Sequence, residues 1–326
     1  MRTRGILALR AGIGPVFSAP ACVPAAPLPW CRPVSTAPFS AIFFEDRFVS
    51  ASDPTAARVS ITDRGYLLGE GVFATLRGYD GTCFRAERHL ALLERGAQAF
   101  GMTLPMSIER IADVADEAAA FTGASDAYVR VTVARGGEGG RPILSVLARG
   151  FDVPSNDEYD RGIPVAIVST RRVPPACMDP SIKSTSYAPS VLARREASLR
   201  GARDGIQLAI DGSIACGTMA NIFLAKNGVL YTPSLESGCR PGVTREAIFD
   251  VAAREGVEIQ EQRIDPVALA EVDEVFFTST RVECLPIATV DGQPIGRSRY
   301  PLTTAFRSAL RRLIEEENSA RLNHDE

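Results

Sequence analysis

The sequence predicts an α+β protein with two domains, on the basis of three observations. The chain has 326 residues, enough for two medium-sized domains, and 45% of them are hydrophobic. Segments with the alternating pattern of strands occur together with segments whose apolar residues recur at helical spacing. Between two such groups, Gly150 to Gly162 holds a proline, an asparagine and four acidic residues, a composition typical of an interdomain linker. We therefore expect domains at residues 41–150 and 163–326, joined by residues 151–162.

Residues 1–40 differ in composition from the rest of the chain. No acidic residue precedes Glu45, and arginine, alanine and proline are frequent. The segment is similar to an organelle transit peptide, and the alternative is an upstream start codon that adds residues without a role. Both interpretations place it outside the fold. The expected location is the cytoplasm, or a mitochondrion or plastid if the segment is a transit peptide.

The first domain is predicted to begin with a hairpin over Ala41–Val49. A glycine-punctuated loop from Thr62 leads into a strand, which the turn signal Tyr79-Asp-Gly-Thr ends. The remaining elements are helices at Glu87–Phe100 and Ser107–Phe121, with Ser107 as N-cap, and strands at Tyr128–Ala134 and Ile143–Ala148.

The second domain is predicted to mix strands and helices in a similar way. Its strands are expected at Ile163–Ser169, Ile206–Ile210, Ile222–Ala225, Val229–Thr232 and Glu274–Thr278. Its helices are expected at Tyr187–Gly201, Val243–Glu255 and Leu302–Glu316, and the last ten residues are expected to be frayed.

Composition excludes several functional classes. The net charge of −3 does not indicate the basic surface that nucleic-acid-binding proteins have. No apolar run approaches the ~20 residues that a membrane-spanning helix needs. The seven cysteines are irregularly spaced, without a C-x-x-C pair, which indicates reduced thiols. With only two histidines, histidine triads and multi-histidine metal sites are disfavoured, and no metal is predicted. The chemistry is therefore expected to use lysine, carboxylates, thiols, hydroxyls or a cofactor.

One lysine motif organises the candidate site. Lys183 lies just ahead of the predicted helix at Tyr187–Gly201; alone, it is most simply an exposed charge. Downstream, the helix start Gly-Val-Thr at 242–244 and the strand end Thr-Ser-Thr at 278–280 supply backbone amides and hydroxyls. Such groups bind phosphate, so the set suggests a phosphate cup beside a Schiff-base lysine.

These segments, in this order from about Ala41 to Arg311, resemble the class IV aminotransferases. The resemblance implies the pyridoxal-phosphate-binding fold type IV, with a small α/β N-terminal domain and a larger C-terminal pseudo-barrel domain. It also implies a homodimer, because a loop from the partner subunit helps to close the site in that family.

The resemblance assigns roles to individual residues. Lys183 matches the lysine that holds pyridoxal phosphate and moves the substrate's α-proton. Matches to the phosphate and cofactor positions are Val243, Thr244, Ser279, Thr280 and Asn221, although Asn221 has an alternative role as a cap of its local turn. Arg135, in a glycine-rich loop, resembles an arginine that binds the substrate carboxylate; the alternative is a flexible hairpin.

The sequence departs from the family pattern at several positions. Cys216 stands where the family has a glutamate that pairs with the pyridine nitrogen, and Arg240 replaces the leucine that rests on the ring. Leu92, three residues after His89, replaces a phosphate-binding arginine, for which Arg88 or Arg95 is a possible substitute. Phe73 replaces a substrate-binding tyrosine of D-amino-acid aminotransferases.

The resemblance implies an aminotransferase that moves an amino group between a D- or branched-chain amino acid and a 2-oxo acid. One alternative is aminodeoxychorismate lyase, which the loop after Arg135 and the strand Phe73–Leu76 favour. The other is a non-catalytic descendant that binds pyridoxal phosphate or a metabolite, which the altered positions favour.

Overall fold

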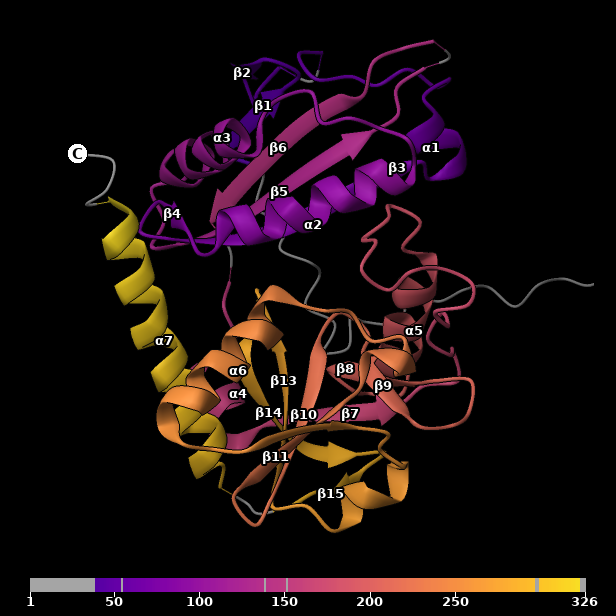
Figure 1. Cartoon of the computed structure of the whole chain (residues 1–326), viewed down its shortest axis with the longest axis vertical. Helices are drawn as coiled ribbons and strands as arrows, with labels where there is room; N and C mark the ends of the chain where they lie inside the picture. Colours follow the sequence, from indigo (N-terminus) through magenta and orange to yellow (C-terminus); the bar gives the residue numbers. More distant parts are fainter. Residues whose placement is uncertain (1–38, 54, 138, 151, 297–298, 323–326) are drawn as a thin grey trace, which may run out of the picture.

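The computed structural model describes residues 39–322 except 54, 138, 151, 297 and 298. These residues form two sheets, one in each half of the chain, with helices packed against both (Figure 1). This arrangement confirms the predicted α+β class. The predicted extension at residues 1–40 lies almost wholly outside the described residues.

The N-terminal sheet is antiparallel, with the strand order β2-β1-β6-β5-β3-β4. Its strands are β1 (Ala41–Phe44), β2 (Arg47–Val49), β3 (Gly71–Tyr79), β4 (Thr82–Cys83), β5 (Asp126–Ala134) and β6 (Ile143–Gly150). The helices of this half are α1 (Arg64–Leu68), α2 (Ala86–Ala99) and α3 (Ile108–Ala120).

The two faces of the N-terminal sheet differ in chemistry because side chains alternate along each strand. On β5, Val129, Val131 and Val133 are buried in one core with the apolar faces of α2 and α3. The residues between them point to the opposite face, where Arg130 lies opposite Thr75 of β3 and Thr132 lies opposite Phe73. This more polar face carries the side chains that reach the lysine loop.

The C-terminal sheet has nine strands, in the order β12-β11-β10-β13-β14-β7-β8-β9, with β15 also paired to β14. The strands are β7 (Ile163–Ile167), β8 (Asp204–Leu208), β9 (Ile214–Gly217), β10 (Asn221–Lys226), β11 (Val229–Pro233), β12 (Ile259–Gln262), β13 (Glu274–Ser279), β14 (Glu283–Val290) and β15 (Gln293–Pro294). The helices are α4 (Asn156–Arg161), α5 (Ala188–Leu199), α6 (Val243–Glu255) and α7 (Pro301–Leu322), with short 3₁₀ turns at Leu235–Ser237 and Pro266–Ala270.

The structure differs from the sequence-based expectations mainly in short elements. The predicted linker contains α4, which begins with a capping box between Ser155 and Glu158. The predicted loop after Thr62 contains α1, for which the Asp63 side chain is the N-cap. Five strands were not predicted, namely β4, β9, β12, β14 and β15. The C-terminal helix α7 continues to Leu322, so the expectation of ten frayed residues was wrong for most of them.

A buried ion-pair network connects the two halves. Glu283 at the start of β14 pairs with Arg77 of β3 at 3.0 Å, and the side chains of both are only 1% exposed. The same carboxylate forms ion pairs with two arginines of α7, Arg307 at 3.1 Å and Arg311 at 2.9 Å. Helix α7 therefore ties the C-terminal sheet to β3, and Figure 1 shows it running up the side of both halves.

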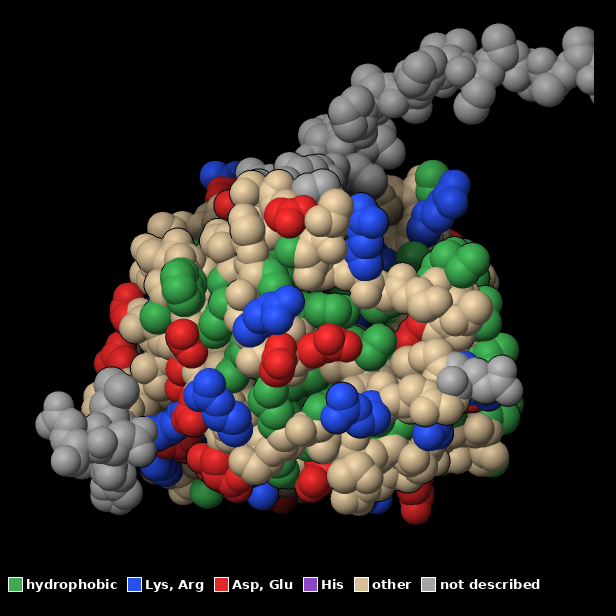
Figure 2. Space-filling model, turned by 90° about the horizontal axis from the view of Figure 1, so that it is seen from above, with side chains coloured by type: hydrophobic (Ala, Val, Ile, Leu, Met, Phe, Trp, Pro, Cys, Tyr) green, Lys and Arg blue, Asp and Glu red, His purple; other side chains and the backbone are tan. Residues whose placement is uncertain are grey.

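The outer surface carries no dominant patch of one charge on the face seen in Figure 2. Lysine and arginine side chains there are interspersed with acidic and apolar ones. Among the helices within the described residues, none is both long and apolar enough to cross a membrane.

Candidate active site

Lys183 lies where the loop before α5 meets the first residues of β3. Its carbonyl oxygen accepts a hydrogen bond from the Phe73 amide at 2.9 Å, and the Thr185 amide donates to the Gly71 carbonyl at 2.8 Å. A single bridge also joins Ser184 to Val72. The lysine loop is thus attached to the N-terminal sheet as a short extra strand segment, which sets the position of the lysine side chain.

The lysine amine faces two aromatic rings. Its Nζ lies 4.9 Å from the Phe73 ring centroid and 5.4 Å from that of Tyr187, and the two rings contact each other edge-on at 5.2 Å. Both rings present apolar surface to the amine, so they limit its contact with water. The sequence identified Lys183 and Phe73, whereas it missed Tyr187, four residues after the lysine.

Burial and nearby cations together make Lys183 easy to deprotonate. Desolvation lowers its pKa well below the usual value, and the guanidinium groups of Arg240, Arg130 and Arg172 lower it further. Each of these effects disfavours the ammonium form. The neutral amine is the form that can act as a nucleophile or a base, and the three arginines favour an anionic ligand beside it.

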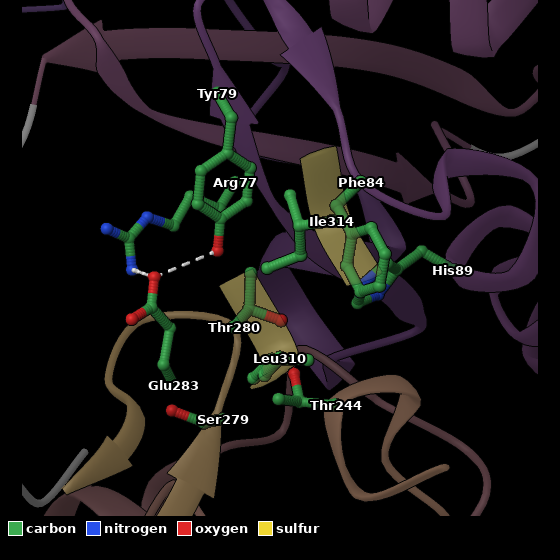
Figure 3. A pocket seen from close by; sticks show the side chains of 10 residues that line it. All are labelled: Arg77, Tyr79, Phe84, His89, Thr244, Ser279, Thr280, Glu283, Leu310 and Ile314. Carbon is green, nitrogen blue, oxygen red and sulfur yellow. Dashed lines mark hydrogen bonds and ion pairs between the residues drawn. The ribbon is translucent and has the colours of Figure 1, made fainter. Parts of the chain in front are cut away.

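A cavity lined by hydroxyl groups lies at the start of α6. Thr244, Ser279 and Thr280 line it together with His89 and Phe84 from the N-terminal half, and the ion pair of Arg77 with Glu283 lies in its wall (Figure 3). Helix α6 begins after Gly242, which supplies no side-chain cap, so the first amides of the helix are free to bind a ligand. The structure thus brings the three predicted hydroxyl residues together at a helix start that favours an anion.

His89 projects into this cavity in its neutral form. Desolvation lowers its pKa to about 3, with further lowering by Arg240, Lys183 and Arg85. At neutral pH the ring therefore offers one donor and one acceptor nitrogen and no charge. The positive charge of this region has to come from the arginines.

A hydrogen bond joins the side chain of Asn221 to the backbone of Arg240. The Asn221 side-chain amide donates to the Arg240 carbonyl at 2.8 Å, and its Oδ1 would lie 2.5 Å from a β-carbon placed on Gly242. Asn221 thus orders the turn that leads into α6. Arg240 donates from Nη1 to the Ser181 carbonyl at 2.7 Å, and burial lowers its pKa to about 10.

Cys216 is a neutral thiol in this structure. It is 5% exposed, and burial raises its pKa to about 11, although the nearby Arg172 acts in the opposite direction. At neutral pH this position therefore supplies a weak hydrogen-bond group and no anion.

Arg135 is the arginine to which the sequence assigned the substrate carboxylate, and no role was predicted for Arg130. Arg135 donates to Glu70 at 3.2 Å and to the carbonyl of Gly101 at 3.2 Å, so its side chain is engaged within the N-terminal half. Arg130 instead stacks on Phe73, with its guanidinium carbon 3.8 Å from the ring centroid. The alternation of polar Tyr128, Arg130 and Thr132 along β5 is the sequence signal that could have identified it.

The proposed substitutes for the cation missing at Leu92 point elsewhere. Arg88 pairs with Glu246, and Arg95 pairs with Asp179 at 3.5 Å. Their side chains are 64% and 67% exposed, and neither lines the cavity at the start of α6. Arg240 is the cation that lowers the pKa of both His89 and Lys183.

Comparison with known proteins places this geometry in context. Residues 71–290 match the family model described as amino-transferase class IV. The chain is 34% identical to a putative branched-chain-amino-acid aminotransferase of Methanocaldococcus jannaschii over 266 residues, which cover 79% of this chain and 90% of the relative. It is 26% identical to a D-alanine aminotransferase of Staphylococcus haemolyticus over 288 residues, 85% of this chain and 99% of the relative. The solved branched-chain amino acid aminotransferase of Escherichia coli superposes with a TM-score of 0.79 at 27% identity, covering 85% of this chain and 95% of that one.

Proposed function

Since the chain belongs to the class IV aminotransferase family, whose members use pyridoxal phosphate in general, we propose that it moves an amino group between an amino acid and a 2-oxo acid with pyridoxal phosphate held at Lys183. The observation that carries the assignment of the site is a lysine amine that faces two aromatic rings and whose pKa is lowered by burial and by three arginines. The relatives reported above are aminotransferases, which does not favour the lyase alternative.

The residues present fit pyridoxal phosphate. The first amides of α6 and the hydroxyls of Thr244, Ser279 and Thr280 suit the phosphate, with Arg240 supplying positive charge. When bound, this cofactor supplies an electron sink that stabilises negative charge at the substrate's α-carbon. Lys183, whose surroundings favour the neutral amine, would accept the proton from that carbon at its Nζ and hold it for return.

Arg130 is the proposed anchor for the substrate's α-carboxylate. Its guanidinium lies on the Phe73 ring and acts electrostatically on Lys183, so a carboxylate bound there would be close to the amine. An arginine can bind a carboxylate through two parallel hydrogen bonds, which orients the substrate as well as holding it. We propose D- or branched-chain amino acids as donors, on the basis of the relatives' activities.

A homodimer is proposed from the surface beside the lysine loop. Large apolar side chains are exposed on α1 and just before it, including Ile61 at 79% and Leu67 at 58%. The end of α1 lies against the start of α5, because a β-carbon on Gly69 would meet the Ser186 hydroxyl, and α5 exposes Leu192 at 57%. A second copy of the chain would cover this apolar surface. Sedimentation velocity should show a dimer in the wild type.

The two lysines of the chain make the central assignment easy to test. They are Lys183 and Lys226, and Lys226 is exposed and paired with Glu271 at 2.8 Å. Purified protein would be incubated with pyridoxal phosphate, reduced with borohydride and mapped by peptide mass spectrometry. The cofactor mass is expected on Lys183, and Lys183→Ala should lose both the label and amino transfer, with Lys226→Ala as the matched control. A label on Lys226, or amino transfer by Lys183→Ala, would refute the proposal.

A further inference from the structure

A second cleft lies beside the cavity at the start of α6. Its lining includes Arg194, Arg203 and Arg281. Ser279 lines both this cleft and the cavity at the start of α6, and Phe277 connects the cleft to Gly217, the neighbour of Cys216. The cleft and the cavity at the start of α6 therefore lie on either side of Ser279, and Arg281 of the cleft follows the cavity residue Thr280 in sequence.

Two of the arginines in the cleft have no carboxylate partner. Arg203 pairs with Glu158 at 2.9 Å. Within the described part of the chain, Arg194 and Arg281 have no carboxylate at ion-pair distance, and Arg194 donates a hydrogen bond from Nη1 to the Met219 sulfur at 3.4 Å. The Nε atom of Arg281 is buried and lacks a hydrogen-bond partner among the described residues. A buried unpaired donor on a cation is costly, which indicates that a ligand completes it.

The acidic residues of the cleft do not neutralise these two arginines. Asp204 accepts hydrogen bonds from the Thr218 hydroxyl and the Gly205 amide, and Asp152 is exposed to solvent. The arginines also repel one another: burial lowers the pKa of Arg281, and Arg194, Arg203 and Arg149 lower it further. An anion between them would relieve this repulsion.

The proposed α-carboxylate anchor and the lysine face the same aromatic ring, because the Arg130 guanidinium carbon lies 3.8 Å and the Lys183 Nζ 4.9 Å from the Phe73 ring centroid. None of these three residues lines the cleft. The α-carboxylate is attached to the reacting carbon, so it has to stay close to the lysine. A second carboxylate, carried several bonds away on the substrate's side chain, can reach the outer cleft instead.

We propose that Arg281 and Arg194 form a subsite for the side-chain carboxylate of a dicarboxylic substrate, so that these residues set a preference for dicarboxylic over monocarboxylic amino acids and 2-oxo acids. This inference rests on the proposed function, because it assumes that the substrate's α-carbon sits at Lys183. Guanidinium groups bind carboxylates with strong, charge-assisted hydrogen bonds, which makes such a preference measurable.

Calorimetry on the cofactor-loaded protein tests the subsite without turnover. Glutarate, a five-carbon diacid, and butyrate, a monoacid, would be titrated into the wild type, Arg281→Met and Arg281→Lys. Methionine keeps the apolar stem of arginine and removes its charge. The methionine variant should bind glutarate about 10- to 100-fold more weakly, with butyrate affinity unchanged within about twofold. The lysine variant should retain part of the glutarate affinity.

Arg195→Met is the matched control, because Arg195 is an exposed neighbour on α5 that does not line the cleft. Glutamate and norvaline, each as both enantiomers, would then be compared by kcat/KM in the same variants. If Arg281→Met weakens both acids equally, or neither, the subsite is refuted while amino transfer by the wild type still stands. If the wild type transfers no amino group, the proposed function fails, and the glutarate titration still decides whether Arg281 binds a carboxylate. Should Arg281→Met fail to fold, Arg194→Met gives the same comparison.

Discussion

Replacing Lys183 by methionine should stabilise the cofactor-free protein at neutral pH, although it removes the residue on which activity depends. The amine is desolvated between Phe73 and Tyr187 and is repelled by Arg240, Arg130 and Arg172, so its protonated form costs free energy in the folded state. Methionine has a similar length and carries no charge. The variant should therefore unfold at a higher urea concentration than the wild type.

The pH dependence gives the sign and the size of the effect. Burial and the arginines lower the folded-state pKa of Lys183 below its unfolded value of about 10.4. Between these two values the unfolded chain binds a proton that the folded chain does not, so wild-type stability rises with pH by about 1.4 kcal/mol per unit. The advantage of Lys183→Met is therefore largest below the folded-state pKa and decreases at that rate as pH approaches 10.4.

Urea denaturation at pH 6, 7, 8 and 9 measures this difference directly. Contributions from the buried cysteines cancel when the variant is subtracted from the wild type. Lys226→Met is the control: pairing with Glu271 raises the pKa of Lys226, so its effect should stay constant over this range. If the Lys183→Met and wild-type stabilities run parallel from pH 6 to 9, Lys183 is not a low-pKa amine and its proposed role as a base loses its physical support.

Three further outcomes follow from the structure. Thr244→Ala should weaken pyridoxal phosphate binding by roughly tenfold or more, since a hydrogen bond to a charged phosphate is lost, whereas Thr244→Ser should keep most of the affinity in the same titration. Glu283→Gln should lower the free energy of unfolding by about 3–5 kcal/mol because it removes the buried carboxylate charge that Arg77, Arg307 and Arg311 share, while Glu271→Gln at the surface should change little; equal urea midpoints would contradict this. Cys216, with its pKa raised to about 11, should resist iodoacetamide at pH 8 while exposed Cys177 reacts, and rapid labelling of both by peptide mapping would show that Cys216 is accessible as a thiolate.

The longer elements of the fold could be predicted from local patterns. Helix α6 begins and ends at the predicted residues, and α3 begins after the predicted N-cap Ser107, because apolar spacing and capping are properties of a short stretch of chain. Strand β14 was missed because most of its residues are buried, so its sequence shows no alternation, and it contains a proline. Helices α1 and α4 were missed because five or six residues are too few to show a helical period.

The candidate site divides in a similar way. Sequence patterns were sufficient to find the lysine motif, the Gly-Val-Thr helix start and the Thr-Ser-Thr strand end, because each is a contiguous stretch whose chemistry depends on its own backbone. The set of cations around Lys183 depends on the folded arrangement of the chain. Arg130 and Arg240 are distant from it in sequence, and the sheet register and the Asn221-ordered turn bring them beside it. Electrostatic effects depend on distance in space and on the exclusion of water, so the lowered pKa of Lys183 is a property of the assembled fold that no local pattern contains.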